Sequence, residues 1–213
     1  MFQSKMRLSE EKDVDQVTQV FLTAMQDNQS WPYRFPHHAQ YPEDHRNYNR
    51  DLFSRLISQE YDDWSVVVVE VLDAAQAWRI VAFSVWGISH ANKRVHGPGY
   101  IPNSRTDSGP AQNDTREAGH SRRDTDPKHL AAFQAALKES NQKYFSQFGS
   151  DQIKLQILGT LPDYRCQGFA SQLPQGCQLY ASLGFIKLGQ QVIHAPGEEE
   201  SLVVECMVFE PEQ

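Results

Sequence analysis

The sequence predicts a mixed α/β fold whose sheet is largely antiparallel and flanked by helices. Some segments carry apolar residues at three- and four-residue steps, which is typical of amphipathic helices, and others are β-branched or alternating, which is typical of strands. Two of the strand-like segments follow each other across a short turn, as in a β-hairpin. Helices and strands alternate along the chain without an internal repeat, and this order favours the mixed α/β class.

Three segments are predicted to be helices, at residues 13–25, 48–57 and 128–148. In the first, Val14, Val17 and Phe21 fall on one face. Residues 31–38, between the first two helices, contain two prolines, which predict an irregular loop.

The predicted strands begin with a hairpin of residues 64–71 and 80–88, joined by a polar turn. A third strand is expected at 153–158, where apolar and polar residues alternate. The last two strands are expected at 186–193 and 202–209, separated by a Pro-Gly-Glu-Glu-Glu turn.

A chain of 213 residues is long enough for one domain with its own core and a long insertion. We therefore predict a single domain over residues 1–213. Its insertion lies at about 90–127, where Gly, Pro, Ser, Asn, Asp and Arg dominate and apolar periodicity is lost. A structureless run of this length inside a compact domain suggests a flexible insertion or a lid over a substrate.

The charge balance limits the classes of partner. With 27 acidic against 20 basic residues the net charge is −7, which argues against nucleic-acid or anionic-membrane binding. The N-terminus has no apolar signal segment, and no apolar run is long enough to span a membrane. Three cysteines cannot all pair with one another and lack zinc-ligand spacing. The composition predicts a cytoplasmic protein without a metal.

The segment after the strand at 153–158 suits an anion. Residues 159–171 read Gly-Thr-Leu-Pro-Asp-Tyr-Arg-Cys-Gln-Gly-Phe-Ala-Ser and lead into an expected helix start. Free N–H groups and the helix dipole attract a phosphate to such a site. Gly168 and Ala170 let the backbone approach closely, and Arg165 can add a charge-assisted contact. The alternative is an ordinary strand-to-helix turn with a surface arginine.

At these residues the sequence resembles the GNAT superfamily of N-acetyltransferases. The family's pyrophosphate signature, Gln/Arg-x-x-Gly-x-Gly/Ala after a strand and a proline, is similar to residues 165–170 after Pro162. Its second motif, Tyr-x-x-x-Gly-Phe, is similar to residues 180–185. The order of the other predicted elements also resembles the family, and the chain is most similar to the small-molecule acetyltransferases common in filamentous fungi.

The resemblance implies that acetyl-CoA is the cosubstrate and a small-molecule amine the acceptor, with direct attack of the amine on the thioester. Tyr180 would protonate the leaving thiolate, which suits a phenol that keeps its proton at neutral pH. The alternative interpretation is that Tyr180 is a packing residue one turn before a glycine that caps a helix. Residues implied to hold the cosubstrate are Leu158 and Thr160 on the strand and Arg165, Cys166, Gln167, Gly168, Phe169, Ala170 and Ser171 in the loop.

The sequence differs from the family pattern in the spacing between the two motifs. The family places a helix, a strand and most of another helix between the two motifs, which needs about 30 residues. Here Ala170 and Tyr180 stand ten positions apart, with Pro174 and Gly176 between them. The chain is therefore expected to lack one strand of the usual fold. This keeps two alternatives in view: a catalytically impaired GNAT-like protein, truncated or mis-spliced, that at most binds CoA, and a scaffold whose insertion is the working part.

Weaker signals come from histidines and carboxylates. His37, His38 and His45 could bind a metal, contact a substrate or lie in a solvated loop. Glu70 and Asp163 are conceivable bases for the incoming ammonium group, without a spacing that supports either. The sequence does not indicate the oligomeric state.

Overall fold

The structure is a computed structural model of the chain and describes residues 3–28, 30–58, 62–97, 99–101, 122–149, 152–165, 180 and 184–210. The chain divides into two compact units. The first unit comprises Met1–Gln26, Glu43–Ser121 and Ser150–Ser171, and the second comprises Asp27–Pro42, Arg122–Gly149 and Gln172–Gln213. The prediction of a single domain over residues 1–213 stays a prediction.

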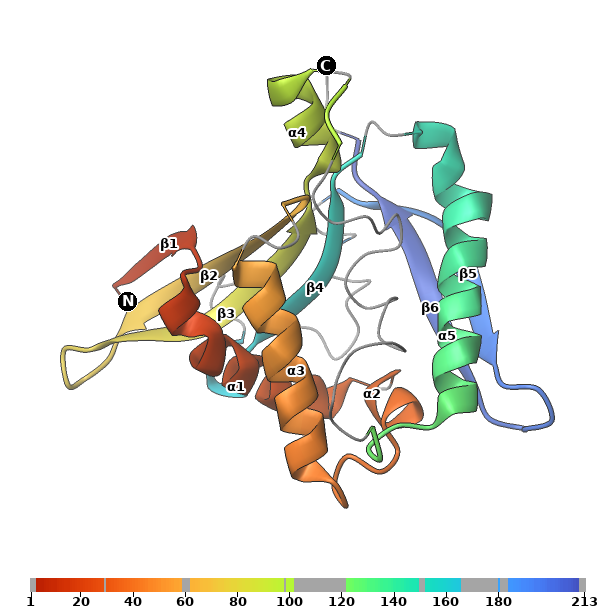
Figure 1. Ribbon diagram of the computed structural model, residues 1–213, viewed down its shortest axis with the longest axis horizontal. Coiled ribbons are helices and arrows are strands. Elements are labelled where there is room, and N and C mark those ends of the chain that lie inside the picture. The colour runs from red at the N-terminus through yellow and green to blue at the C-terminus, as the bar shows by residue number, and fades with distance from the viewer. Residues whose placement is uncertain are drawn as a thin grey trace. The chain divides into compact units, whose positions relative to one another are not determined.

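The first unit contains a four-stranded antiparallel sheet (Figure 1). Its order is β1 (Ser4–Leu8), β2 (Trp64–Leu72), β3 (Trp78–Gly87) and β4 (Lys154–Thr160). The predicted mixed α/β class with an antiparallel sheet is confirmed, as are the β2–β3 hairpin and the strand at β4. β1 was not predicted, because a short edge strand of mostly polar, exposed residues carries no apolar alternation.

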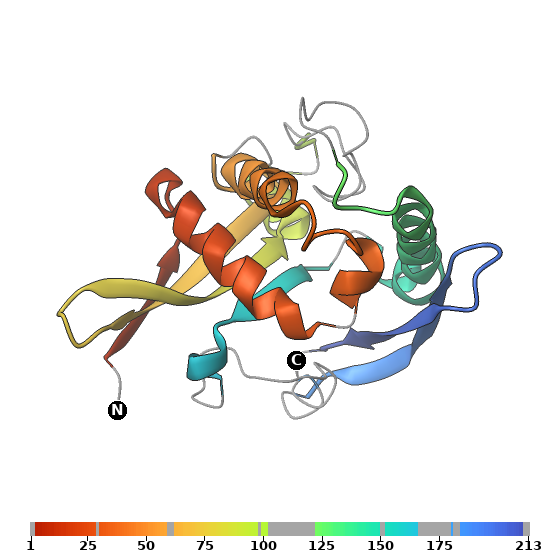
Figure 2. The same cartoon turned by 90° about the horizontal axis from the view of Figure 1, so that it is seen from below.

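Two helices cover the same face of this sheet, α1 (Val14–Ala24) and α3 (Pro42–Ile57) (Figure 2). Short 3-10 turns, η1 (Glu11–Asp13) and η2 (Met25–Asp27), flank α1. Phe21 on α1, Phe53 on α3 and Phe83 on β3 meet edge to face, with centroids 5.1, 5.4 and 6.0 Å apart. All three rings are buried, so this aromatic cluster joins helices and sheet into one core.

The expected insertion begins with a helix that the composition did not reveal. Residues Ser89–His96 form α4, which ends at Gly97 with a positive φ of 92°. Asn92 and Ser89 both donate hydrogen bonds to the buried carboxylate of Asp63, at 3.0 and 2.5 Å. These contacts with the start of β2 stabilise a polar helix that has no buried residues of its own. Residues 102–121 lie outside the described residues, so the predicted flexible or lid-like role stays a prediction.

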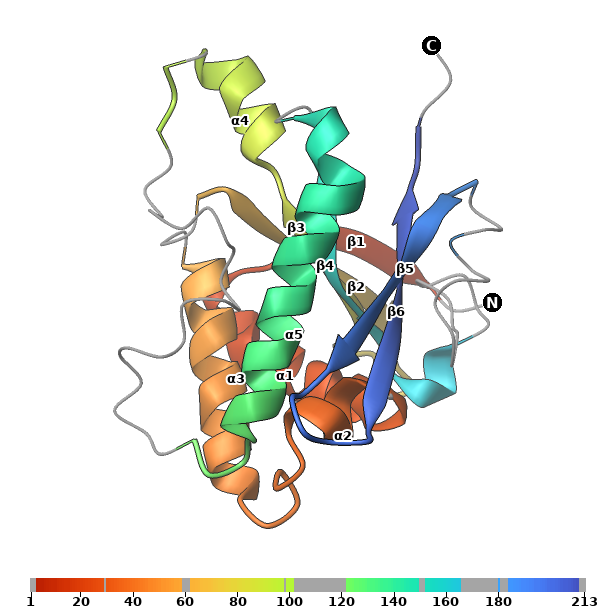
Figure 3. The ribbon, with the colours of Figure 1, turned by 90° about the vertical axis from the view of Figure 1, so that its right-hand side faces the viewer.

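The second unit contains a helix packed on a hairpin. The long helix α5 (Pro127–Ser140) continues into the π-helical η3 (Asn141–Phe145) and the 3-10 turn η4 (Ser146–Phe148). The antiparallel hairpin of β5 (Ile186–His194) and β6 (Ser201–Val208) lies beside α5 (Figure 3). Both strands and the helix were predicted. Ala136, Ile193 and Tyr33 form the buried centre of this packing.

The short helix α2 (Ser30–Arg34) corrects the prediction of an irregular loop at residues 31–38. Pro32 falls in its first turn, where the missing N–H would have no partner inside the helix, so a proline is tolerated there. Pro42 likewise begins α3, which therefore starts six residues before the predicted position 48.

A histidine joins three elements of the second unit. His129, in the first turn of α5, donates from Nδ1 to the Tyr33 carbonyl at 2.6 Å. Its Nε2 contacts the Glu198 carboxylate, between β5 and β6, at 2.5 Å, and its ring stacks on Tyr33. Both acceptors are satisfied together only by an imidazolium, which has two N–H donors. Burial opposes that charge, but the hydrogen bonds to Glu198 and Tyr33 and the nearby Asp126 outweigh it, so the pKa of His129 is raised above 6.5.

We expect the stability of this unit to fall as the pH rises. A histidine with a raised pKa in the folded state contributes its full stabilisation at pH values below its unfolded-state pKa of about 6.5. This contribution to the free energy of unfolding is lost as the pH rises through the folded-state pKa. Losing one charge-assisted hydrogen bond corresponds to about 1–2 kcal/mol. Hydrogen exchange of the α5 amides over a pH series measures this loss. His129→Gln should make α5 stability nearly independent of pH, whereas the exposed control His37→Gln should keep the pH dependence of the wild type. A wild-type stability that does not change with pH would contradict a stabilising imidazolium at His129.

No helix among the described residues is long and apolar enough to cross a membrane.

Candidate functional site

The predicted cosubstrate strand is β4. Leu158 and Thr160 pair with Ser84 and Ala82 of β3. β4 is the last strand in the order of the four-stranded sheet, and among the described residues its other edge pairs with no strand. Such an edge presents backbone N–H and C=O groups that can hydrogen-bond an extended ligand.

The end of β4 is fixed by its proline. The N–H of Leu161 donates to the Val81 carbonyl at 2.9 Å and closes the pairing with β3. Pro162 then begins the 3-10 turn η5 (Pro162–Tyr164), and the N–H of Arg165 donates back to the Pro162 carbonyl at 3.1 Å. A proline cannot donate to a further ladder bond, so the chain leaves the sheet at this point.

The Arg165 side chain contacts two backbone carbonyls. Its Nε donates to the Thr160 carbonyl at 3.3 Å and its Nη2 to the Ala24 carbonyl at 3.3 Å. Ala24 is the last residue of α1, where carbonyls lack a partner inside the helix and a cation is favourable. In the structure Arg165 therefore ties the end of α1 to the end of β4. Its predicted contact with a phosphate stays a prediction.

A close contact at Gly159 was not predicted from the sequence. A Cβ atom added there would lie 2.5 Å from Cε1 of Phe83 and 3.3 Å from Cβ of Ala24. The absence of a side chain thus lets β4 lie directly against the aromatic core below α1. A glycine near the end of the predicted strand was the available signal, because glycine in a strand often marks a close backbone approach.

Much of the predicted phosphate loop lies outside the described residues, namely Cys166, Gln167, Gly168, Phe169, Ala170 and Ser171. Leu158, Thr160 and Arg165 lie together in the first unit, and Tyr180 belongs to the second.

Tyr180 has the surroundings of a residue near a helix end. Its carbonyl accepts a hydrogen bond from the N–H of Phe185 at 2.8 Å, and Gly184 has a positive φ of 87°. A 6→1 hydrogen bond over a left-handed glycine is the pattern of a Schellman cap. The Tyr180 ring is tilted against the Phe185 ring, with centroids 5.2 Å apart. This geometry agrees with the packing role, and the role as general acid stays a prediction.

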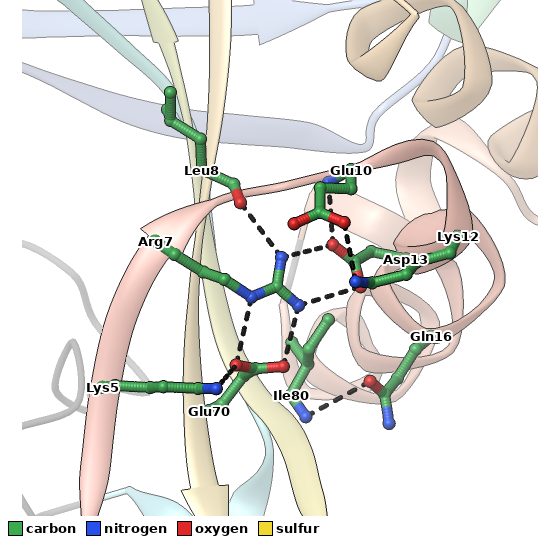
Figure 4. A network of polar contacts seen from close by, with 9 residues as sticks. All are labelled: Lys5, Arg7, Leu8, Glu10, Lys12, Asp13, Gln16, Glu70 and Ile80. Carbon is green, nitrogen blue, oxygen red and sulfur yellow. Dashed lines mark hydrogen bonds and ion pairs between the residues drawn. The ribbon is translucent and has the colours of Figure 1, made fainter.

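Glu70, a conceivable base, is an ion-pair partner in the structure. Its carboxylate accepts from Arg7 at 2.7 and 3.1 Å and pairs with Lys5 at 3.2 Å (Figure 4). These hydrogen bonds, the one from Arg7 above all, hold the pKa of Glu70 below its usual value against the effect of burial. A carboxylate stabilised in its charged form is a poor base, so Glu70 is better assigned to the sheet than to chemistry. Asp163 is exposed on η5.

The three histidines do not form a cluster of metal ligands. His45 is buried within α3, His37 is exposed, and Nδ1 of His38 contacts the Phe35 carbonyl at 2.6 Å. Across the described ranges no group of three or more His, Cys, Asp or Glu side chains is placed to hold a metal ion.

No family model matches the sequence, and no curated protein matches it significantly. Among solved structures, the chain is similar to a histone acetyltransferase HPA2 and related acetyltransferase from Corynebacterium glutamicum. The two share 14% sequence identity and a TM-score of 0.49, over 99% of this chain and 97% of that chain.

Proposed function

We propose that the chain is an N-acetyltransferase that transfers acetyl from acetyl-CoA to a small-molecule amine. The observation that carries the proposal is the order of features at the end of β4. A strand with an unpaired edge in the described residues runs into Pro162 and Arg165, where the sequence begins its GNAT-like Arg-x-x-Gly-x-Ala motif. The second motif, starting at Tyr180, follows in the order typical of that superfamily.

In the proposed reaction a neutral amine attacks the thioester carbonyl directly. The new C–N bond forms as the C–S bond breaks, the thiolate takes a proton from the Tyr180 phenol, and the amine gives its excess proton to water. The β4 edge at Leu158 and Thr160 would pair with the pantetheine arm. Backbone amides from Arg165 onward would bind the pyrophosphate.

The proposed setting is the cytoplasm, with no metal, nucleic acid or membrane as partner. A net charge of −7 disfavours polyanionic surfaces. Three cysteines in 213 residues, of which Cys206 is a buried free thiol, suit a reducing compartment.

A second candidate is a catalytically impaired GNAT-like protein that at most binds CoA. Two observations favour it. The ten positions from Ala170 to Tyr180 are few for the family pattern, and the Arg165 guanidinium already donates to the Thr160 and Ala24 carbonyls.

Calorimetric titration with acetyl-CoA tests cosubstrate binding. We expect saturable binding that weakens at least tenfold in Arg165→Ala, because that change frees the ends of α1 and β4 and removes a cation beside the loop. Arg50→Ala is the matched control, since Arg50 is exposed and pairs only on the surface with Asp15. A folded wild-type protein that does not bind would contradict the enzymatic candidate and leave the impaired protein, without a working cosubstrate site.

Turnover separates the two candidates. If the chain is an enzyme, a panel of amines should include an acetylated one, and Tyr180→Phe should lower kcat by about 100-fold or more through loss of the general acid. Tyr144→Phe is the matched control, because the Tyr144 hydroxyl donates to the Gln190 carbonyl in the same unit and has no role in the proposed reaction. Binding without turnover favours the impaired protein, and turnover indifferent to Tyr180→Phe would refute the role given to that residue.

A further inference from the structure

An arginine without a carboxylate partner lies in the second unit. Arg34 ends α2, and its guanidinium carbon lies 4.4 Å from the ring centroid of Phe133, 4.9 Å from that of Phe35 and 5.7 Å from that of Trp31. Its Nε is buried and has no hydrogen-bond acceptor among the described residues. Within the part of the chain that the structure describes, no carboxylate pairs with this side chain. A buried donor on a charged group is costly when it stays unmatched.

A second guanidinium increases the local positive charge. Arg122 lies over the Phe35 ring at 5.5 Å, and its Nε pairs with the fully buried Asp124 at 3.0 Å. Burial lowers the pKa of Arg34 to about 10, and the positive charge of Arg122 adds to that effect. Asp124 is already paired with Arg122, so among the described residues the positive charge of Arg34 is left in excess.

We propose that Arg34, supported by Arg122, binds the carboxylate of a small organic molecule. One excess positive charge matches a monoanion better than a doubly charged phosphate. The planar edge of a guanidinium suits a carboxylate, which can accept two parallel hydrogen bonds. Of the three rings only that of Phe133 is partly exposed, because Trp31 and Phe35 are buried, so Phe133 provides the apolar surface for the body of the ligand beside its charged end. Arg34 is only half-buried, so part of its side chain remains open to solvent.

The site is separate from the proposed acetyl transfer. Its residues all belong to the second unit, whereas Leu158, Thr160 and Arg165 belong to the first. The carboxylate site requires neither acetyl-CoA nor an amine, so it can be present whether or not the chain transfers acetyl groups.

Benzoate and benzamide provide a direct test, because they share a shape and differ in charge. The full chain is titrated with each by calorimetry at constant ionic strength. We expect saturable binding of benzoate and none of benzamide. Arg34→Gln should weaken benzoate binding at least tenfold, and Arg34→Lys should weaken it less because the charge is kept without the planar fork.

Arg50→Gln is the matched control and should leave benzoate binding unchanged, since Arg50 is an exposed arginine of the first unit. Circular dichroism checks that each variant is folded. The wild-type comparison of benzoate with benzamide does not depend on any variant. Equal binding of both, no saturable binding, or binding indifferent to a folded Arg34→Gln would overturn the proposal and leave Arg34 held by its aromatic rings alone.

Discussion

Replacing Arg7 with methionine is expected to lower the free energy of unfolding by about 3 kcal/mol, because two buried carboxylates lose their shared guanidinium partner. Arg7 on β1 donates to Asp13 at 2.6 and 3.0 Å and to Glu70 at 2.7 and 3.1 Å (Figure 4). Asp13 and Glu70 are only 5% and 6% exposed, so water cannot replace the lost donor. Methionine keeps the apolar stem and removes only the charge and its hydrogen bonds. Urea denaturation at pH 7 measures the change.

The same network sets a dependence on acid. Burial works against the charged form of Asp13, but the hydrogen bonds from Arg7 outweigh it, and the pKa lies below its ordinary 3.8. The pKa of Glu70 is likewise below 4.5. Groups with lowered folded-state pKa values stabilise above their unfolded values and lose this contribution as the pH falls through the folded ones. Wild-type stability should therefore fall below about pH 4.5, and Arg7→Met should reduce that slope.

The matched control is Arg50→Met. Arg50 also pairs with a carboxylate, Asp15 at 2.7 Å, but the two side chains are 47% and 66% exposed. Exposed pairs contribute about 0–1 kcal/mol, so this variant should lose much less stability. Equal losses of unfolding free energy in the two variants would show that the Arg7 ion pairs contribute no more than an exposed surface pair, and that burial of the carboxylates does not strengthen them.

Elements with a strong apolar period were predicted from the sequence, and weakly patterned elements were not. The β2–β3 hairpin and α1 bury a continuous apolar face, so local pattern and tertiary packing favour the same structure. β1 and α4 have no such face. They are stabilised by partners distant in sequence, Arg7 by Glu70 and Asn92 by Asp63, and periodicity does not record such contacts.

The candidate site likewise contains features that follow from local sequence and features that depend on distant contacts. The motif at Arg165 and its position after a strand and a proline follow from the sequence, because turn chemistry is local. The guanidinium contact with Ala24 bridges 141 residues of chain and could not be predicted. The unpaired Nε of Arg34 was also beyond prediction, since it depends on Phe133 and Arg122 arriving from other parts of the second unit.

Gly159→Ala is expected to lower the free energy of unfolding by about 2 kcal/mol, because one methyl group must enter a filled core. The new Cβ would lie 2.5 Å from the Phe83 ring, which is 1% exposed and held edge to face by Phe21 and Phe53. The ring cannot turn aside, so β4 must move instead. Since Thr160 follows directly, acetyl-CoA binding should weaken in the same variant.

A double-mutant cycle with Phe83→Leu separates this collision from other effects. Leucine lacks the ring atoms that the methyl group would meet, so in the Phe83→Leu background Gly159→Ala should lower the free energy of unfolding by less than about 1 kcal/mol. Such a coupling is expected of residues in direct contact. Gly87→Ala on β3 is the control for the substitution itself, because a Cβ there would meet its nearest atoms at an ordinary 3.4 Å. If Gly159→Ala cost the same with phenylalanine or leucine at position 83, the close approach of β4 to the aromatic core would not be what requires glycine.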